Sequence, residues 1–145
     1  CAFALSGVVD ASGRGKITAS AGTGPAQAGT IVANAGSVVI ALPHGRDFPG
    51  CGSVLMPEIA SGLELTKTAS AAWTSLVRIG AERARLHIAP SSPATHGYLV
   101  RGNVAGVTGV SGDWLAIDFI GDTGRSSKGW IARSDTAPLM TGDRP

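Results

Sequence analysis

The densest group of chemically versatile side chains lies between His44 and Cys51. This segment reads His-Gly-Arg-Asp-Phe-Pro-Gly-Cys, which combines a general base, two charged groups and a thiol. A cysteine nucleophile needs a histidine within hydrogen-bond reach, and many such hydrolases hold the cysteine at a helix N-terminus. Residues 53–56 instead predict a short strand that Pro57 ends. We therefore interpret the segment as a turn between strands, with Cys51 available for a bridge, and expect the chain not to be an enzyme.

The other side chains that ligate metals or act as acids are scattered. The histidines are His44, His87 and His96, and neither Cys-x-x-Cys nor His-x-x-x-His spacing occurs, so we expect no metal site. The glycine pairs at 13–15 and 22–24 do not precede a predicted helix, so they are not phosphate loops. The carboxylates are scattered, and the sequence places no pair of them near an apolar pocket, so a glycosidase pair is unsupported. The sequence therefore predicts no cofactor.

The two cysteines, Cys1 and Cys51, leave three interpretations open. Because the sequence starts with cysteine rather than methionine, we expect a processed chain. A Cys1–Cys51 disulfide would close a loop of about 50 residues and stabilise the fold by about 4 kcal/mol on the chain-entropy model. Cys1, followed by Ala2, also suits the lipid anchor of a bacterial lipoprotein, and the third interpretation is two free thiols. The first two predict an extracytoplasmic protein, whether periplasmic, cell-surface or secreted.

Composition excludes several classes of protein. Hydrophobic residues make up 43% and charged residues 15% of the 145, which is the opposite of a disordered chain. With 21 glycines and 8 prolines, a helical bundle is not expected. The net charge of +2 is evenly spread, so no nucleic acid partner is predicted, and no apolar run reaches the length of a transmembrane segment. The many small neutral residues suit self-association, or they reflect only the base composition of the gene.

Short apolar runs separated by turn residues predict an all-β fold, of the sandwich or small-barrel kind. Residues 68–85 also fit a helical period, but Gly80 and the β-branched and aromatic content of 73–79 favour strand. Gly106 and Gly109 suggest a bulge in their strand. The predicted strands are 2–9, 15–20, 30–34, 37–42, 53–56, 63–67, 73–79, 85–89, 98–101, 104–110, 114–120, 129–132 and 138–140.

A change in composition near Gly80 predicts two domains and a short tail. Residues 1–78 are rich in Gly and Ala, and we expect a β-rich, sandwich-like or barrel domain of unassigned type. Residues 79–140 hold more aromatic and charged side chains, and we expect a small barrel on which the first domain packs. Residues 141–145 form the tail.

The second domain contains a clear hairpin signal. Ser111-Gly112-Asp113 predicts a tight turn. After it, Leu115, Ile117 and Phe119 alternate with Trp114, Ala116 and Asp118, so the first three are expected in the core and Trp114 on the other face. Trp114 then either contacts a ligand or covers the barrel by packing. Trp130, between Gly129 and Ile131, is expected in the core.

Four stretches within residues 84–136 share their order with a known family. They read Ala-Arg-Leu-His-Ile-Ala-Pro-Ser, Gly-Tyr-Leu-Val-Arg-Gly-Asn, Val-Ser-Gly-Asp-Trp-Leu-Ala-Ile-Asp-Phe and Lys-Gly-Trp-Ile-Ala-Arg-Ser-Asp. Together they resemble the bacterial SH3-like domain family, often called SH3b, with its Gly-Asp-Trp hairpin and closing Gly-Trp motif. Asn103 departs from the aspartate that is frequent in the family, and the loop at 121–128 is long for the last hairpin.

The resemblance implies an SH3-like barrel that binds or spaces and does not catalyse. Many domains of this family accompany cell-wall enzymes or sit in envelope proteins, and some contact peptidoglycan or its peptides. We therefore expect a non-enzymatic extracytoplasmic binding module with a cell-wall or protein ligand. The expected ligand-contacting residues are Tyr98, Arg101, Asp113 and Trp114, because aromatic faces beside a polar turn can hold a peptide or a sugar.

Two other functions stay open. One is a structural subunit of an extracellular or virion-like assembly, in which both domains serve packing. The other is a small secreted cysteine hydrolase built on Cys51 and His44.

Overall fold

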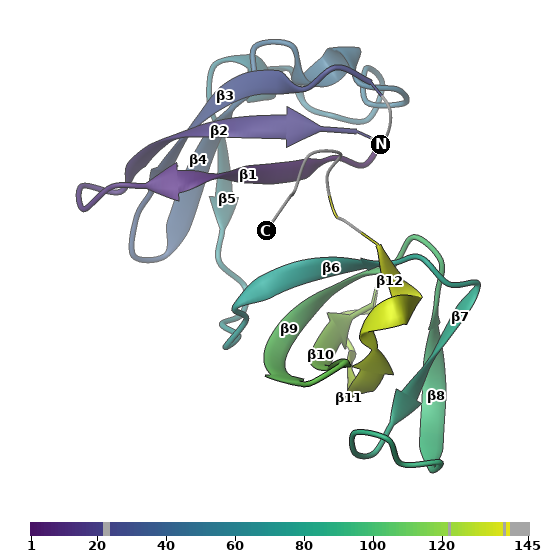
Figure 1. Ribbon diagram of the computed structural model, residues 1–145. Coiled ribbons are helices and arrows are strands. Elements are labelled where there is room, and N and C mark those ends of the chain that lie inside the picture. The colour runs from purple at the N-terminus through teal and green to yellow at the C-terminus, as the bar shows by residue number, and fades with distance from the viewer. Residues whose placement is uncertain (22–23, 122, 138, 140–145) are drawn as a thin grey trace. The chain divides into compact units, whose positions relative to one another are not determined.

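The structure is a computed structural model that describes residues 1–21, 24–121, 123–137 and 139. As predicted, the fold is all-β, and its strands form two antiparallel sheets (Figure 1). The chain divides into two compact units, Cys1–Ser70 and Ala71–Leu139. No helix in the described ranges is long and apolar enough to cross a membrane.

The first unit is a five-stranded sheet in which consecutive strands are neighbours, in the order β1-β2-β3-β4-β5. Short turns join antiparallel strands, so a sequence of short apolar runs broken by glycine and serine folds locally into such a meander. The strands are β1 (Ala4–Val9), β2 (Arg14–Ser20), β3 (Gln27–Ala33), β4 (Ser37–Ala41) and β5 (Leu63–Thr66).

The core of the first unit lies between one face of this sheet and the segment that connects β4 to β5. Ile17, Ala19 and Ile40 come from the sheet, while the connecting segment adds Leu42, Phe48, Cys51 and Ile59. Two 3-10 turns, η1 (Gly45–Asp47) and η2 (Pro57–Ala60), shape this segment. The layer opposite the sheet is therefore a folded connection, where the sequence predicted a sandwich or barrel.

The Cys1–Cys51 disulfide is present, with an S–S distance of 2.05 Å and a Cα–Cα distance of 4.6 Å. It ties the start of the chain to the segment that connects β4 to β5, and it excludes a lipid on the Cys1 sulfur in this structure. The strand predicted at 53–56 is wrong. The amides of Val54 and Leu55 both donate to the Cys51 carbonyl, and Pro57 starts η2, so the chain turns instead of extending.

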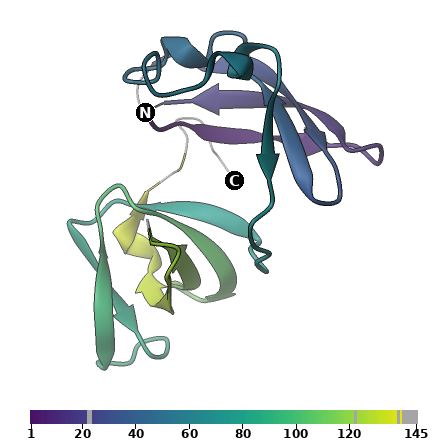
Figure 2. The same cartoon turned by 180° about the vertical axis from the view of Figure 1, so that it is seen from behind.

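The second unit is a seven-stranded sheet in the order β12-β6-β9-β10-β11-β7-β8, bent into a half-barrel (Figure 2). Its core contains aliphatic side chains and alanines, among them Ile79, Leu86, Leu115, Ile117 and Ile131. The elements are β6 (Ser75–Ile79), β7 (Arg83–His87), β8 (Thr95–Val100), β9 (Val104–Ser111), β10 (Trp114–Ile120), β11 (Ser126–Ala132), η3 (Arg133–Asp135) and β12 (Thr136–Ala137).

The β9–β10 hairpin forms as the sequence predicted. Ser111 pairs with Trp114 across a two-residue loop, in which Gly112 adopts a φ of +56°. Leu115 and Ile117 are buried, and Phe119 packs against the same core. The predicted bulge is confirmed, because the register shifts between the Ala116–Gly109 and Ile117–Val107 pairs, which leaves Thr108 as the extra residue.

The division between the units lies earlier than the predicted boundary at 78/79. β6 pairs with β9 and with β12, so these long-range hydrogen bonds place it in the second unit. The region 68–85, for which a helix was the alternative, holds β6 and the start of β7. Of the strand predicted at 138–140, residues 138 and 140 lie outside the described residues, as does the predicted tail.

Candidate functional site

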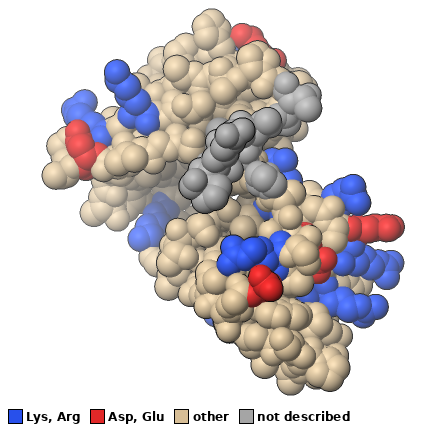
Figure 3. Space-filling view, viewed as in Figure 1, with Lys and Arg blue, Asp and Glu red and all other residues tan. Residues whose placement is uncertain are grey.

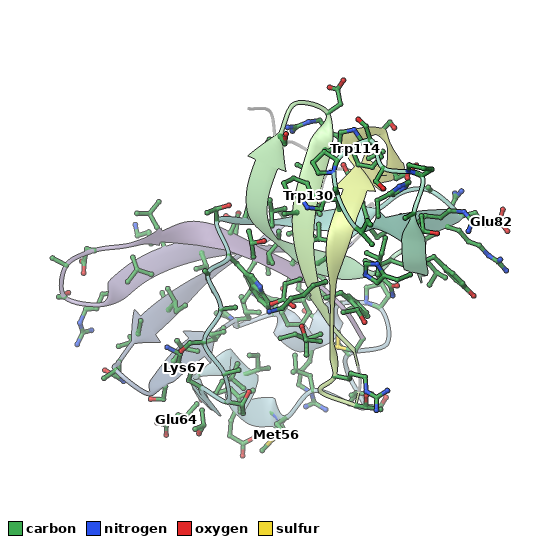
Figure 4. The ribbon with its side chains drawn as sticks, turned by 90° about the horizontal axis from the view of Figure 1, so that it is seen from below. Met56, Glu64, Lys67, Glu82, Trp114 and Trp130 are labelled. Carbon is green, nitrogen blue, oxygen red and sulfur yellow. A yellow bond between two sulfur atoms is a disulfide. The ribbon has the colours of Figure 1, made fainter. Side chains whose placement is uncertain are left out.

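One face of the second sheet carries two tryptophans on neighbouring strands. Trp114 pairs with Ala132, and Ala116 pairs with Trp130, and directly opposite residues of an antiparallel pair point to the same side. Because Leu115 alternates with these residues and is buried, Trp114 and Trp130 face away from the core. Figure 4 shows their side chains close together on adjacent strands.

A histidine on the next strand fixes the Trp114 ring. His87 pairs with Trp130, and its ring lies edge-on to Trp114 with 4.8 Å between the ring centroids. The His87 Nδ1 is 2.6 Å from the Ser92 carbonyl oxygen, which holds the imidazole in place. The indole is thus oriented before any ligand arrives, which lowers the conformational entropy that binding would cost.

An open pocket of about 420 Å³ lies beside Trp114. It is lined by Asp113, Trp114, Ala132, Arg133 and Ser134. The Arg133 amide donates to the Asp113 carbonyl at 2.7 Å, so the hairpin turn and η3 form one wall. The pocket therefore presents an indole, a carboxylate and a guanidinium to solvent.

Two arginines extend this face along β7. Arg83 and Arg85 are exposed and alternate with the buried Ala84 and Leu86, so they share the face of His87. The Arg83 guanidinium carbon lies 4.7 Å from the centre of the Tyr98 ring, a cation–π contact. Figure 3 shows basic side chains gathered over the region of β7.

The third tryptophan, Trp73, covers another part of the same face. Gly106 pairs with Asp118, and a Cβ on Gly106 would come within 2.4 Å of the Trp73 ring, so the missing side chain makes room for the indole. The Trp73 Nε1–H donates to Asp118 Oδ2 at 3.2 Å. All three tryptophans of the chain therefore lie outside the aliphatic core. We call Trp73, His87, Tyr98, Trp114 and Trp130 the outer aromatic face.

Hydrogen bonds lower the pKa of Asp118 within this face. The largest cause is the bond donated by the Ser126 hydroxyl to Asp118 Oδ1. Partial burial raises the pKa in opposition, while the Trp73 indole and the charge of Lys128 lower it further. Asp118 is consequently held as a carboxylate that anchors Trp73.

The structure brings two of the four predicted contact residues together, because Asp113 and Trp114 line one pocket, and it places a third, Tyr98, on the same face. Tyr98 is 49% exposed and shares the outer face with Trp114, and Asp113 lines the adjoining pocket. Arg101 lies in the turn between β8 and β9, where its amide donates to the Glu82 carbonyl. Within the part of the chain that the structure describes, no contact joins Arg101 to Asp113 or Trp114.

Sequence reasoning misplaced one tryptophan and missed several neighbours. The expectation that Trp130 packs in the core is wrong, because its partner Ala116 belongs to the outer face while Ile131 is buried. The run Arg83 to His87 alternates with a period of two, so this pattern could have revealed its exposed face. Trp73, which was predicted to start the strand at 73–79, lies before β6, and its place over Gly106 depends on tertiary pairing.

The cysteine–histidine segment does not have the geometry of a nucleophile and its base. Cys51 is fully buried and its sulfur is bonded to Cys1. His44 faces Asp47, with Nδ1 3.3 Å from Oδ2, and both side chains are largely exposed. In the ranges that the structure covers, no three His, Cys, Asp or Glu side chains are grouped as a metal site would need.

No protein-family model, no curated protein and no solved structure matches this chain.

Proposed function

We propose that this chain is a non-enzymatic binding module that holds a cell-wall or protein ligand on its outer aromatic face. The observation that carries the proposal is the placement of three tryptophans on the solvent side of a sheet whose core is aliphatic. Tryptophan and tyrosine are enriched at binding surfaces because each offers a large rigid apolar area with a polar edge. The core packs without these rings, and because Trp73 is exposed and Trp114 and Trp130 are partly exposed, each ring offers area to a ligand.

The charges around this face favour a ligand that carries carboxylates. Arg83 and Arg85 lie on the same face, and Arg133 lines the pocket beside Trp114. A guanidinium binds a carboxylate through two parallel hydrogen bonds, while a neighbouring indole stacks on an apolar ring or chain. Peptidoglycan peptides offer both features, in agreement with what the SH3-like resemblance implies.

The disulfide supports a location outside the cytoplasm. Structural disulfides persist in oxidising compartments such as the periplasm and the cell exterior. The bridge joins Cys1 to the fully buried Cys51, as expected for a structural bond.

The proposal is tested by co-sedimentation with purified peptidoglycan. We expect the wild type to sediment with it, and Trp114→Ala and Arg85→Ala to weaken binding at least tenfold. Arg14→Ala, an exposed arginine of the first unit, is the matched control and should bind as the wild type does. Melting curves establish that each variant is folded at the assay temperature. If the wild type stays in the supernatant, the proposed cell-wall ligand is contradicted. If Trp114→Ala and Arg85→Ala both bind as the wild type does, the proposed site is contradicted.

A second function, a structural subunit of an extracellular or virion-like assembly, is favoured by one separate observation. In the part of the chain that the structure describes, β1 forms an edge of the first sheet and contains neither a charged residue nor a proline.

A further inference from the structure

Among the described residues, the first sheet ends on a strand, β1, that carries none of the features that usually protect a sheet edge. An edge strand exposes unpaired backbone amides and carbonyls, and proteins guard such edges with charges, prolines, bulges or short length. β1 is six residues long, and all six pair with β2 in one unbroken register. Its sequence, Ala-Leu-Ser-Gly-Val-Val, contains neither a charge nor a proline.

The other three sheet edges in the described ranges are each guarded. β5 has four residues, one of which is Glu64, and Lys67 follows it directly. β8 meets β7 with a register shift between Arg85 and His87. β12 is only two residues long. The contrast within one chain makes the open β1 edge a specific feature rather than a general property of the fold.

The side chains at the end of β1 are also unusually exposed. Val8 is 83% exposed and Val9 is 40% exposed. β-branched residues favour strand pairing, where they pack against neighbours across the pleat. Leu5 and Val9 share one face by alternation, and Leu5 already packs against the first unit's core.

We propose that β1 pairs antiparallel with β1 of a second copy of this chain, which joins two five-stranded sheets edge to edge. A twofold axis perpendicular to the sheet keeps both core faces on the same side, so Leu5, Gly7 and Val9 meet the same residues of the second copy. No like charges oppose each other along an uncharged strand. The nearest carboxylate, Asp10, is engaged within its own turn by the Ser12 hydroxyl and by the Ser12 and Arg14 amides.

The pairing has a small interface, so we expect a dissociation constant in the micromolar range. Analytical ultracentrifugation of the full chain from about 1 µM to about 1 mM measures it. Val8→Lys places a charge on the edge and should weaken dimerisation at least tenfold. Val54→Lys is the matched control, because Val54 is 71% exposed in the same unit and lies on a loop. Ser6→Lys is a second edge variant on the same face as Val8, in case Val8→Lys disturbs folding.

Hydrogen exchange tests the pairing on the wild type alone. As protein concentration rises, the β1 amides should become more protected while the β5 amides do not. Trp114→Ala, which should lose ligand binding, should dimerise as the wild type does. A failure of the proposed binding function can therefore be told apart from a failure of the proposed dimer. A wild type that stays monomeric at the highest concentration overturns the proposal. So does a dimer that both edge variants leave intact, or one that Val54→Lys weakens equally. Concentration-dependent protection of β5 in place of β1 would assign the interface to the other edge and also overturn it.

Discussion

At the scale of single residues, side-chain direction was predictable where alternation was long enough. Leu115, Ile117 and Phe119 point to the core and Trp114 points away, because four or more alternating positions fix a face. The face on which Trp130 lies could not be predicted in this way, because the residue before it, Gly129, has no side chain that could establish an alternation of polar and apolar positions. Trp73 is positioned by a hydrogen bond to Asp118 and by the space above Gly106, and both arise only from tertiary pairing.

The Asp118 network predicts a pH dependence of stability. The pKa of this carboxyl is lowered in the folded protein, mainly by the Ser126 hydroxyl. Its stabilising contribution is therefore complete above the unfolded value of about 4 and is lost as pH falls through the folded value. Urea unfolding of the wild type and Asp118→Asn should show a difference in unfolding free energy that is largest near about pH 6 and shrinks towards about pH 2.5. A difference that stays constant across this range would show that the charge of Asp118 does not stabilise the fold.

At the scale of elements, most strands could be predicted because their apolar runs are short and bounded by turn residues. Residues 53–56 look like a strand in composition, yet the disulfide at Cys51 and the start of η2 at Pro57 force turns on them. Composition suggested a boundary at Gly80, whereas hydrogen bonding assigns β6 to the second unit. Local sequence carries turn propensity, but long-range pairing decides which sheet a strand joins.

The disulfide should stabilise the first unit in particular. Cys1→Ser breaks the bridge at its exposed end and leaves the buried Cys51 in place. We expect a loss of about 4 kcal/mol in unfolding free energy, because the loop that the bridge closes becomes free in the unfolded chain. Hydrogen exchange should show reduced amide protection of β2–β4 in the variant. Reductant should lower the unfolding free energy of the wild type to that of Cys1→Ser and leave the variant unchanged. A wild type whose unfolding free energy stays the same after complete reduction contradicts this role.

At the scale of the whole molecule, composition and turn density were sufficient to predict an all-β chain of two units. The outer aromatic face could not be predicted as a unit, because its members come from β7, β8, β10, β11 and the segment before β6. Only the order of strands in the sheet places Tyr98, His87, Trp130 and Trp114 on one face. The function we propose depends on this assembled face rather than on any one motif.

The most direct test of that function is to follow the three tryptophan indole N–H signals by ¹H–¹⁵N NMR during titration with soluble peptidoglycan fragments. Each tryptophan gives its own signal, and single Trp→Phe variants assign them. We predict that the Trp114 and Trp130 signals shift progressively and saturate, while backbone signals of β2–β4 stay in place. Saturable binding that leaves all three indole signals unmoved would contradict the account, because the ligand would then sit away from the outer aromatic face.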